Sequence, residues 1–125
     1  MTDCIFCKIT RFEEPAQIVR RGTHSLTIVP LNPVVEGHVI TIPYQHVSGF
    51  DVDPHVSANT MWDAATYAQT HRVEGLADYN IIVNNGPHAT QSVFHLHVHL
   101  VPRKSGDGLA LPWYSGKPTT RKDKP

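Results

Sequence analysis

The feature that most constrains the fold of this chain is a segment near its end, residues 94–101, in which histidine alternates with apolar residues. Its histidines are His95, His97 and His99. Successive side chains of a β-strand point to opposite faces. The segment is therefore predicted to be a strand with the three imidazoles on one face, about 6.6 Å apart, and with Phe94 and the other apolar residues on the opposite face. We expect one chemical face and one core face.

Two interpretations of this run compete. A histidine-rich strand can arise by chance or bind metal adventitiously, although such a run is expected in roughly one of a hundred chains of this composition. Alternatively, neutral imidazole is a nucleophile at physiological pH, and neighbouring imidazoles can orient it and move protons. Asn84, Gln91 and Ser92 come shortly before the run, and their amide and hydroxyl groups suit phosphate oxygens. We therefore favour the catalytic interpretation.

The rest of the chain predicts an antiparallel sheet with one long helix. Short runs rich in branched residues give five strands, at residues 16–21, 24–29, 39–42, 79–84 and 94–101. The helix is predicted to begin at Asp53-Pro54, because aspartate accepts hydrogen bonds from the first amides and proline suits the first helical position. It should end near Gly75. Four residues at helical spacing should face the sheet: Met61, Ala64, Ala65 and Ala68. The expected fold class is α+β.

Composition limits the class of partner. Eleven basic residues balance eleven acidic ones, so no long-range field favours nucleic acid or a membrane surface, and a small ligand is expected instead. The apolar runs are far shorter than the roughly 20 residues that cross a bilayer, and the first residues form no secretion signal, so the cytoplasm is the expected location. One domain over residues 1–115 is predicted, followed by a disordered tail over residues 116–125.

At these residues the sequence resembles the histidine triad (HIT) family of nucleotide hydrolases and transferases. In the family motif, three histidines alternate with apolar residues and two apolar residues follow the third histidine. Residues 95–101 match this motif. Residues 32–33, 37–39 and 42–43 match a second segment, and the likeness extends over residues 3–113. The resemblance implies a HIT-like fold, which is a five-stranded antiparallel sheet with one long helix and a short N-terminal helix.

The resemblance also implies a reaction. His97 would attack the α-phosphorus of a purine nucleotide derivative, such as a nucleoside phosphoramidate or a dinucleoside polyphosphate, to give a nucleotidyl-histidine that water or another acceptor resolves. His99 and His38 would contact phosphate and complete the proton network, and the backbone carbonyl of His95 would fix the tautomer of His97. The alternative is a catalytically weak nucleotide-binding, zinc-stabilised interaction module.

Further ligand positions follow from the same resemblance. Positions near the ribose and phosphates are Asn84, Gln91 and Ser92. Positions of the apolar slot for the base are Ile5, Phe6, Ile9, Ile28 and Leu31, although a plain core role is as good an explanation for each alone. Two positions near the expected nucleoside depart from the family pattern. Pro30 stands where many relatives carry an acidic residue that holds the ribose hydroxyls, and Thr90 stands where a glycine often precedes Gln-Ser.

The cysteines lie three positions apart, at Cys4 and Cys7. This spacing suits a redox pair or half of a tetrahedral Zn²⁺ site, and no βαβ pattern supports the redox interpretation. Resemblance to the bacterial family members implies that His46 and His95 complete a structural zinc site, with unmetallated thiols as the alternative. It also implies a homodimer formed through the long helix and a strand edge.

Overall fold

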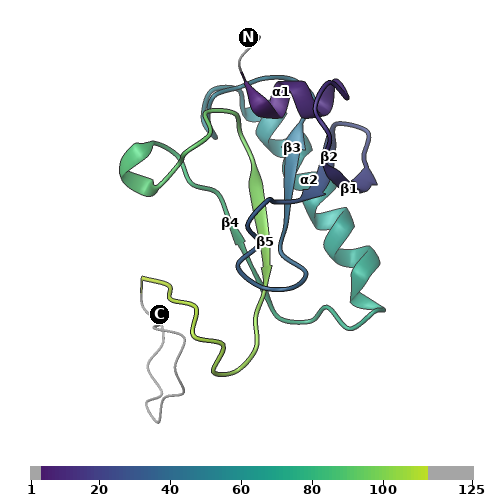
Figure 1. Ribbon diagram of the computed structural model, residues 1–125, viewed down its shortest axis with the longest axis vertical. Coiled ribbons are helices and arrows are strands. Elements are labelled where there is room, and N and C mark those ends of the chain that lie inside the picture. The colour runs from purple at the N-terminus through teal and green to yellow at the C-terminus, as the bar shows by residue number, and fades with distance from the viewer. Residues whose placement is uncertain (1–3, 113–125) are drawn as a thin grey trace.

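The computed structural model describes residues 4–112 and contains a five-stranded antiparallel sheet with strand order β1-β2-β3-β5-β4 (Figure 1). The elements are α1 (Ile5–Thr10), β1 (Gln17–Arg21), β2 (Ser25–Val29), β3 (Val39–Pro43), α2 (Pro54–Arg72), β4 (Tyr79–Ile82), the 3₁₀ turn η1 (Pro87–Ala89) and β5 (Val98–Pro102). The predicted α+β fold, including its short N-terminal helix, is confirmed. The tail predicted over residues 116–125 lies outside the described residues.

The two faces of the sheet are covered by different helices. On one face, Phe6 and Ile9 of α1 pack against apolar residues of β2 and β3, namely Leu26, Ile28, Ile40 and Ile42. On the other face, Tyr67 and Ala68 of α2 pack against Val39 and Leu100. Figure 1 shows the same division, with α1 near one end of the sheet and α2 running along its back.

The register between β3 and β5 decides on which face the histidines lie. His99 is paired with Ile40, and paired residues of neighbouring strands point to the same face. The Ile40 side chain belongs to the cluster under α1, so His99 lies on the face opposite α2. The imidazole of His99 therefore occupies the side of the sheet that α2 leaves uncovered.

The histidine run is only partly strand, and this corrects the prediction for residues 94–101. Strand β5 begins at Val98, and Phe94 is half exposed instead of lying in the core. If the ladder continued in register, Pro43 would face Leu96, but proline has no N–H to donate. The carbonyl of Pro43 instead accepts a hydrogen bond from the side chain of His95, at 2.9 Å. The ladder between β3 and β5 therefore includes His99 but neither His95 nor His97.

The long helix has the predicted start, and its predicted inner face is confirmed at Ala64 and Ala68. Asp53 caps it by accepting from the amide of His55 at 3.0 Å, with Pro54 at the first helical position. Ala65 is exposed, against expectation, whereas Asp63 is almost fully buried. None of the helices within residues 4–112 combines the length and the apolar character needed to span a bilayer.

The buried carboxylate of Asp63 joins α2 to the hairpin of β1 and β2. It accepts from the hydroxyl of Ser25 at 2.6 Å and from the amide of His24 at 3.0 Å. A guanidinium nitrogen of Arg20 lies 3.7 Å from the other carboxylate oxygen. A buried charge is costly unless it is paired and hydrogen-bonded, and here it is both. Asp63 thus fixes the far edge of the sheet against the helix.

Candidate active site and metal centre

The orientation of His97 leaves one ring nitrogen available for chemistry. Its Nδ1 lies 2.8 Å from the backbone carbonyl oxygen of His95, and a carbonyl only accepts, so Nδ1 carries the proton and donates. The lone pair is therefore on Nε2. Burial lowers the pKa of His97, partly offset by this hydrogen bond, so the ring is neutral near neutral pH. The rings of His97 and Phe6 pack edge to face, with centroids 5.1 Å apart.

A second chain of hydrogen bonds fixes the tautomers of His38 and His99. The amide of Val34 donates to Nδ1 of His38 at 3.1 Å, so the proton of a neutral His38 is on Nε2. This Nε2 lies 3.0 Å from Nδ1 of His99 and donates to it. His99 consequently carries its own proton on Nε2. Burial lowers the pKa of both rings, for His99 to about 4 with contributions from His97 and His38, which keeps them neutral.

Neighbouring rings therefore have opposite hydrogen-bonding roles. His97 presents a lone pair and His99 presents an N–H, and their ring centroids lie 5.0 Å apart. A lone pair can attack an electrophilic centre while the adjacent N–H binds an oxygen that gains charge. This pairing suits acyl or phosphoryl transfer.

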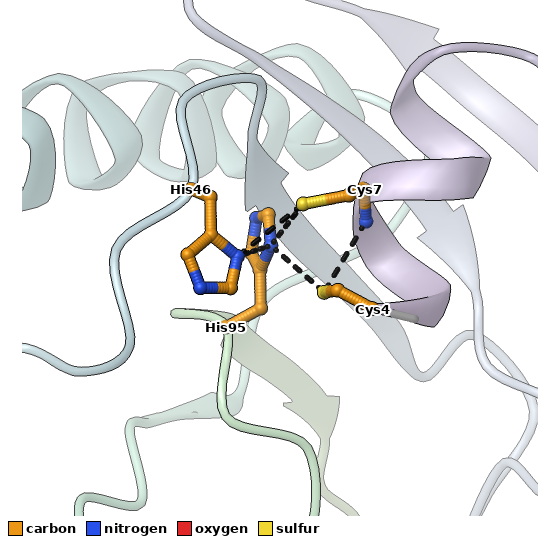
Figure 2. Close-up of side chains that lie close together, drawn as sticks. All are labelled: Cys4, Cys7, His46 and His95. Atoms are coloured by element: carbon orange, nitrogen blue, oxygen red, sulfur yellow. Dashed lines mark hydrogen bonds between the residues drawn. The ribbon is translucent and has the colours of Figure 1, made fainter. Parts of the chain in front are cut away.

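The four predicted metal ligands lie together beside this group (Figure 2). Sγ of Cys7 is 3.3 Å from Nδ1 of His46, and Sγ of Cys4 is 3.4 Å from Nδ1 of His95. All four ligand atoms lie within 4.8 Å of one another. Cys4 also caps α1 by accepting from the amide of Cys7. Two thiols and two imidazoles at this spacing could hold one tetrahedral metal ion.

The protonation state of His95 fits a role as a metal ligand. Its Nε2 donates to the carbonyl of Pro43, which leaves the lone pair of Nδ1 directed at the cysteines. Burial lowers the pKa of His95 to about 4, with His46 and His97 contributing, so the ring is neutral. Burial and the adjacent Cys4 raise the pKa of the Cys7 thiol, and a bound cation would favour the thiolate instead.

The predicted polar ligand positions lie in the loop between β4 and β5. Asn84 is half-buried and Ser92 is exposed. Gln91 is buried, and its side-chain amide bonds to backbone groups of Ser48, Gly86 and Val93. Of the residues predicted for the base slot, three belong to the core cluster under α1: Phe6, Ile9 and Ile28. The other two, Ile5 and Leu31, are exposed.

Sequence reasoning missed the groups that set the tautomers. The carbonyl of Pro43 and the amide of Val34 act through the backbone, which every residue shares, so no residue type indicated them. It also missed Asn85, whose side-chain oxygen accepts from the amide of Phe50 at 2.9 Å. A polar loop ahead of the histidines was the only available indication.

A neutral, oriented imidazole beside an imidazole N–H donor, on the face of a five-stranded sheet opposite the long helix and next to a Cys₂His₂ cluster, defines a histidine triad protein. The chain belongs to this family, because the family model described as HIT domain matches residues 11–106.

Several curated relatives match most of this chain. An uncharacterized HIT-like protein of Methanocaldococcus jannaschii, MJ0866, is 38% identical over 84% of this chain and 82% of its own length. The adenylylsulfatase HINT3 of Arabidopsis thaliana is 35% identical over 86% of this chain and 55% of its own length. The adenosine 5′-monophosphoramidase HNT1 of Saccharomyces cerevisiae is 32% identical over 88% and 69%.

A solved structure shares the fold. It is a zinc-bound histidine triad family protein from Mycobacterium smegmatis, with a TM-score of 0.79 and 32% identity over 87% of this chain and 81% of that one. The family thus has members named for hydrolysis of adenosine phosphate derivatives and a member with bound zinc.

Proposed function

We propose that this protein is a nucleotidyl hydrolase or transferase that acts at the α-phosphate of a nucleotide through a covalent nucleotidyl intermediate on His97. The observation that carries this proposal is the hydrogen bond from Nδ1 of His97 to the carbonyl of His95, at 2.8 Å. In the buried, neutral ring this hydrogen bond places the proton on Nδ1 and leaves the lone pair on Nε2. A nucleophilic imidazole requires this state.

The proposed reaction has two displacements at phosphorus. In the first, the lone pair of His97 forms a P–N bond and the bond to the leaving group breaks, so that group departs with the electron pair. In the second, an acceptor hydroxyl, of water or another molecule, forms a P–O bond and loses its proton to solvent, and the P–N bond breaks, which restores the lone pair of His97. The N–H of His99, held by His38, binds a phosphoryl oxygen in both steps.

We propose an adenylyl or similar purine nucleotidyl group as the transferred part. The relatives named adenosine 5′-monophosphoramidase and adenylylsulfatase have this group in common and differ in what is displaced from it. In this chain Asn84 and Ser92 are the proposed contacts to the ribose and phosphates. The apolar slot for the base would include Ile5 and Leu31, which are both exposed.

The test is a rapid-quench experiment with adenosine 5′-phosphoramidate, adenylyl sulfate and a diadenosine polyphosphate. Mass spectrometry of the quenched protein should show an adenylylated peptide that contains His97, formed and lost at rates that match turnover. Turnover with no such peptide at any time would refute the covalent mechanism. Binding of AMP without turnover of any substrate would support the alternative function, a nucleotide-binding module.

We also propose that the Cys₂His₂ cluster holds one structural zinc ion. Its ligands would be Cys4, Cys7, His46 and His95. When bound, the ion would supply a cross-link between α1, the loop after β3 and the start of the histidine run. Because four protein ligands close a tetrahedral site, no position remains for substrate. Reduced thiols of this kind persist in the cytosol, which we propose as the location.

We further propose a homodimer formed through β4 and α2. Strand β4 lies at the edge of the sheet, and an edge strand offers unpaired backbone groups to a second copy. Tyr79 and Ile81 on β4 are each 38% exposed, and Trp62 on α2 is 71% exposed. Tyr79 and Trp62 line a hollow of ≈ 1120 Å³ on this side.

The test of the dimer is sedimentation equilibrium. It should show a dimer that Ile81→Lys dissociates, and a monomeric wild type at micromolar concentration would refute the proposed dimer.

A further inference from the structure

Two loops of the site lie side by side. The metal loop, residues 44–50, follows β3 and contains His46. The substrate loop, residues 83–97, joins β4 to β5 and contains the two proposed ligand contacts, Asn84 and Ser92. The loops meet in the backbone where the amide of Leu96 donates to the carbonyl of Val47 at 2.8 Å.

The side chain of Gln91 joins the same two loops farther along. Its Nε2 donates to the carbonyl of Ser48 at 2.8 Å and to that of Val93 at 3.1 Å, and its Oε1 accepts from the amide of Gly86 at 2.8 Å. A primary amide has only two N–H donors, so both are engaged with backbone carbonyls. Gln91 is buried, so its side chain can turn toward a ligand only by giving up one of these two hydrogen bonds, which water would then have to replace.

A third link comes from Asn85. Its Oδ1 accepts from the amide of Phe50 at 2.9 Å, and a Cβ added at Gly49 would overlap this oxygen. The carbonyl of Phe50 in turn accepts from the hydroxyl of Ser57 on α2 at 2.6 Å. The end of the metal loop is therefore anchored on the long helix, and the substrate loop is anchored on the metal loop.

We propose that Gln91 is a positioning residue, which holds Asn84 and Ser92 in place by tying the substrate loop to the metal loop and does not itself donate to the ligand. This inference rests on the proposed nucleotide function. A donation from Gln91 to phosphate would require one of its two backbone carbonyls to lose its partner. The geometry therefore assigns phosphate recognition to Ser92 and Asn84 and the ordering of their loop to Gln91.

The test compares Gln91→Met, Gln91→Glu and the exposed control Gln17→Ala, all with metal retained. Hydrogen exchange of the Gly86 amide in ligand-free protein should accelerate in the Met variant, which has no acceptor, and should stay slow in the Glu variant, which keeps one. Neither variant donates to Ser48 or Val93. Both should bind AMP about tenfold or more weakly by calorimetry, because the loss of two partly buried hydrogen bonds has an effect of this order.

Two results would overturn the proposal. Weaker AMP binding with unchanged Gly86 exchange in the Met variant would make Gln91 a ligand contact. Faster exchange of the Gly86 amide with unchanged AMP affinity would mean that the hydrogen bonds of Gln91 between the two loops do not contribute to binding. If the wild type neither binds AMP nor turns over an adenylyl compound, the proposed function fails and the positioning role fails with it, whereas failure of the positioning role alone leaves wild-type binding and turnover intact.

Discussion

The backbone carbonyl of His95 lies 2.8 Å from Nδ1 of His97, so the residue that could ligate a metal through its side chain orients the neighbouring nucleophile through its backbone. The side chain of His95 is in turn held by the carbonyl of Pro43. The proposed metal site and the proposed active site therefore share one residue. A change in the position of His95 would be transmitted directly to the ring of His97.

Replacement of His97 should remove turnover while the protein still folds. His97→Asn deletes the nucleophilic nitrogen and retains a polar side chain of smaller volume, so AMP affinity should change little while kcat falls below detection. His99→Asn and His38→Asn should lower kcat by about 10²–10⁴-fold, as for other positioned acid–base groups. Steady-state kinetics and calorimetry measure both effects, and near-normal kcat in His97→Asn would contradict the mechanism.

Stability should depend on pH through His99. Burial lowers its folded-state pKa to about 4, against about 6.5 in the unfolded chain. Between these values the unfolded state binds more protons, so the free energy of unfolding should rise with pH there. The contribution is complete above about pH 6.5 and is lost as the pH falls toward 4.

The variant His99→Gln isolates this effect. It should flatten the pH dependence by at most about 1.4 kcal/mol per pH unit within this window. Urea unfolding of metal-saturated protein at several pH values measures the slope. His24→Gln, on an exposed side chain, is the matched control and should keep the wild-type slope. An unchanged slope in His99→Gln would mean that this ring does not titrate as described.

Loss of a metal ligand should affect stability before chemistry. Elemental analysis should find one zinc ion per chain, and Cys4→Ser or Cys7→Ser should release it and lower Tm, because the six-residue helix α1 is too short to be stable alone. The kcat that remains in folded protein should fall less than the metal content does. Immediate loss of kcat on chelation, without loss of structure, would indicate a catalytic metal instead.

The buried carboxylate of Asp63 should contribute more to stability than the capping carboxylate of Asp53. Asp63→Ala leaves the hydroxyl of Ser25 and the amide of His24 without their acceptor and Arg20 without its counter-charge, so the free energy of unfolding should fall by about 3–5 kcal/mol. Asp53→Ala removes one exposed cap and should cost about 1 kcal/mol. Denaturant titrations of both variants provide the comparison, and equal losses would refute the role of Asp63.

Ribose selectivity should be weak because Pro30 has no side-chain acceptor. AMP and 2′-deoxy-AMP should differ in binding by about 0.5–1.5 kcal/mol, the value of one ordinary hydrogen bond. Pro30→Asp should raise the preference for ribose, since a carboxylate there can accept from both hydroxyls. Calorimetry with both ligands tests this, and a hundredfold preference in the wild type would reveal another strong acceptor.

The sequence by itself determined most of the strands, the start of the long helix and which residues could do chemistry. Strand runs, the Asp53-Pro54 helix start and the alternation of histidines follow from local spacing, because periodicity encodes which face a side chain occupies. The spacing of Cys4 and Cys7 indicated half of a metal site on the same basis.

Tertiary structure decided which atoms of those residues are available. The free nitrogens of His95 and His99 depend on the carbonyl of Pro43 and the amide of Val34, which are distant in sequence and identical in type to other backbone groups. Strand β5 begins only at Val98, because ahead of it the amide of Leu96 donates to the carbonyl of Val47 and not to β3. Gln91 is committed to backbone carbonyls because the two loops meet there. Hydrogen bonds between distant segments have no local pattern, so only the folded chain specifies them.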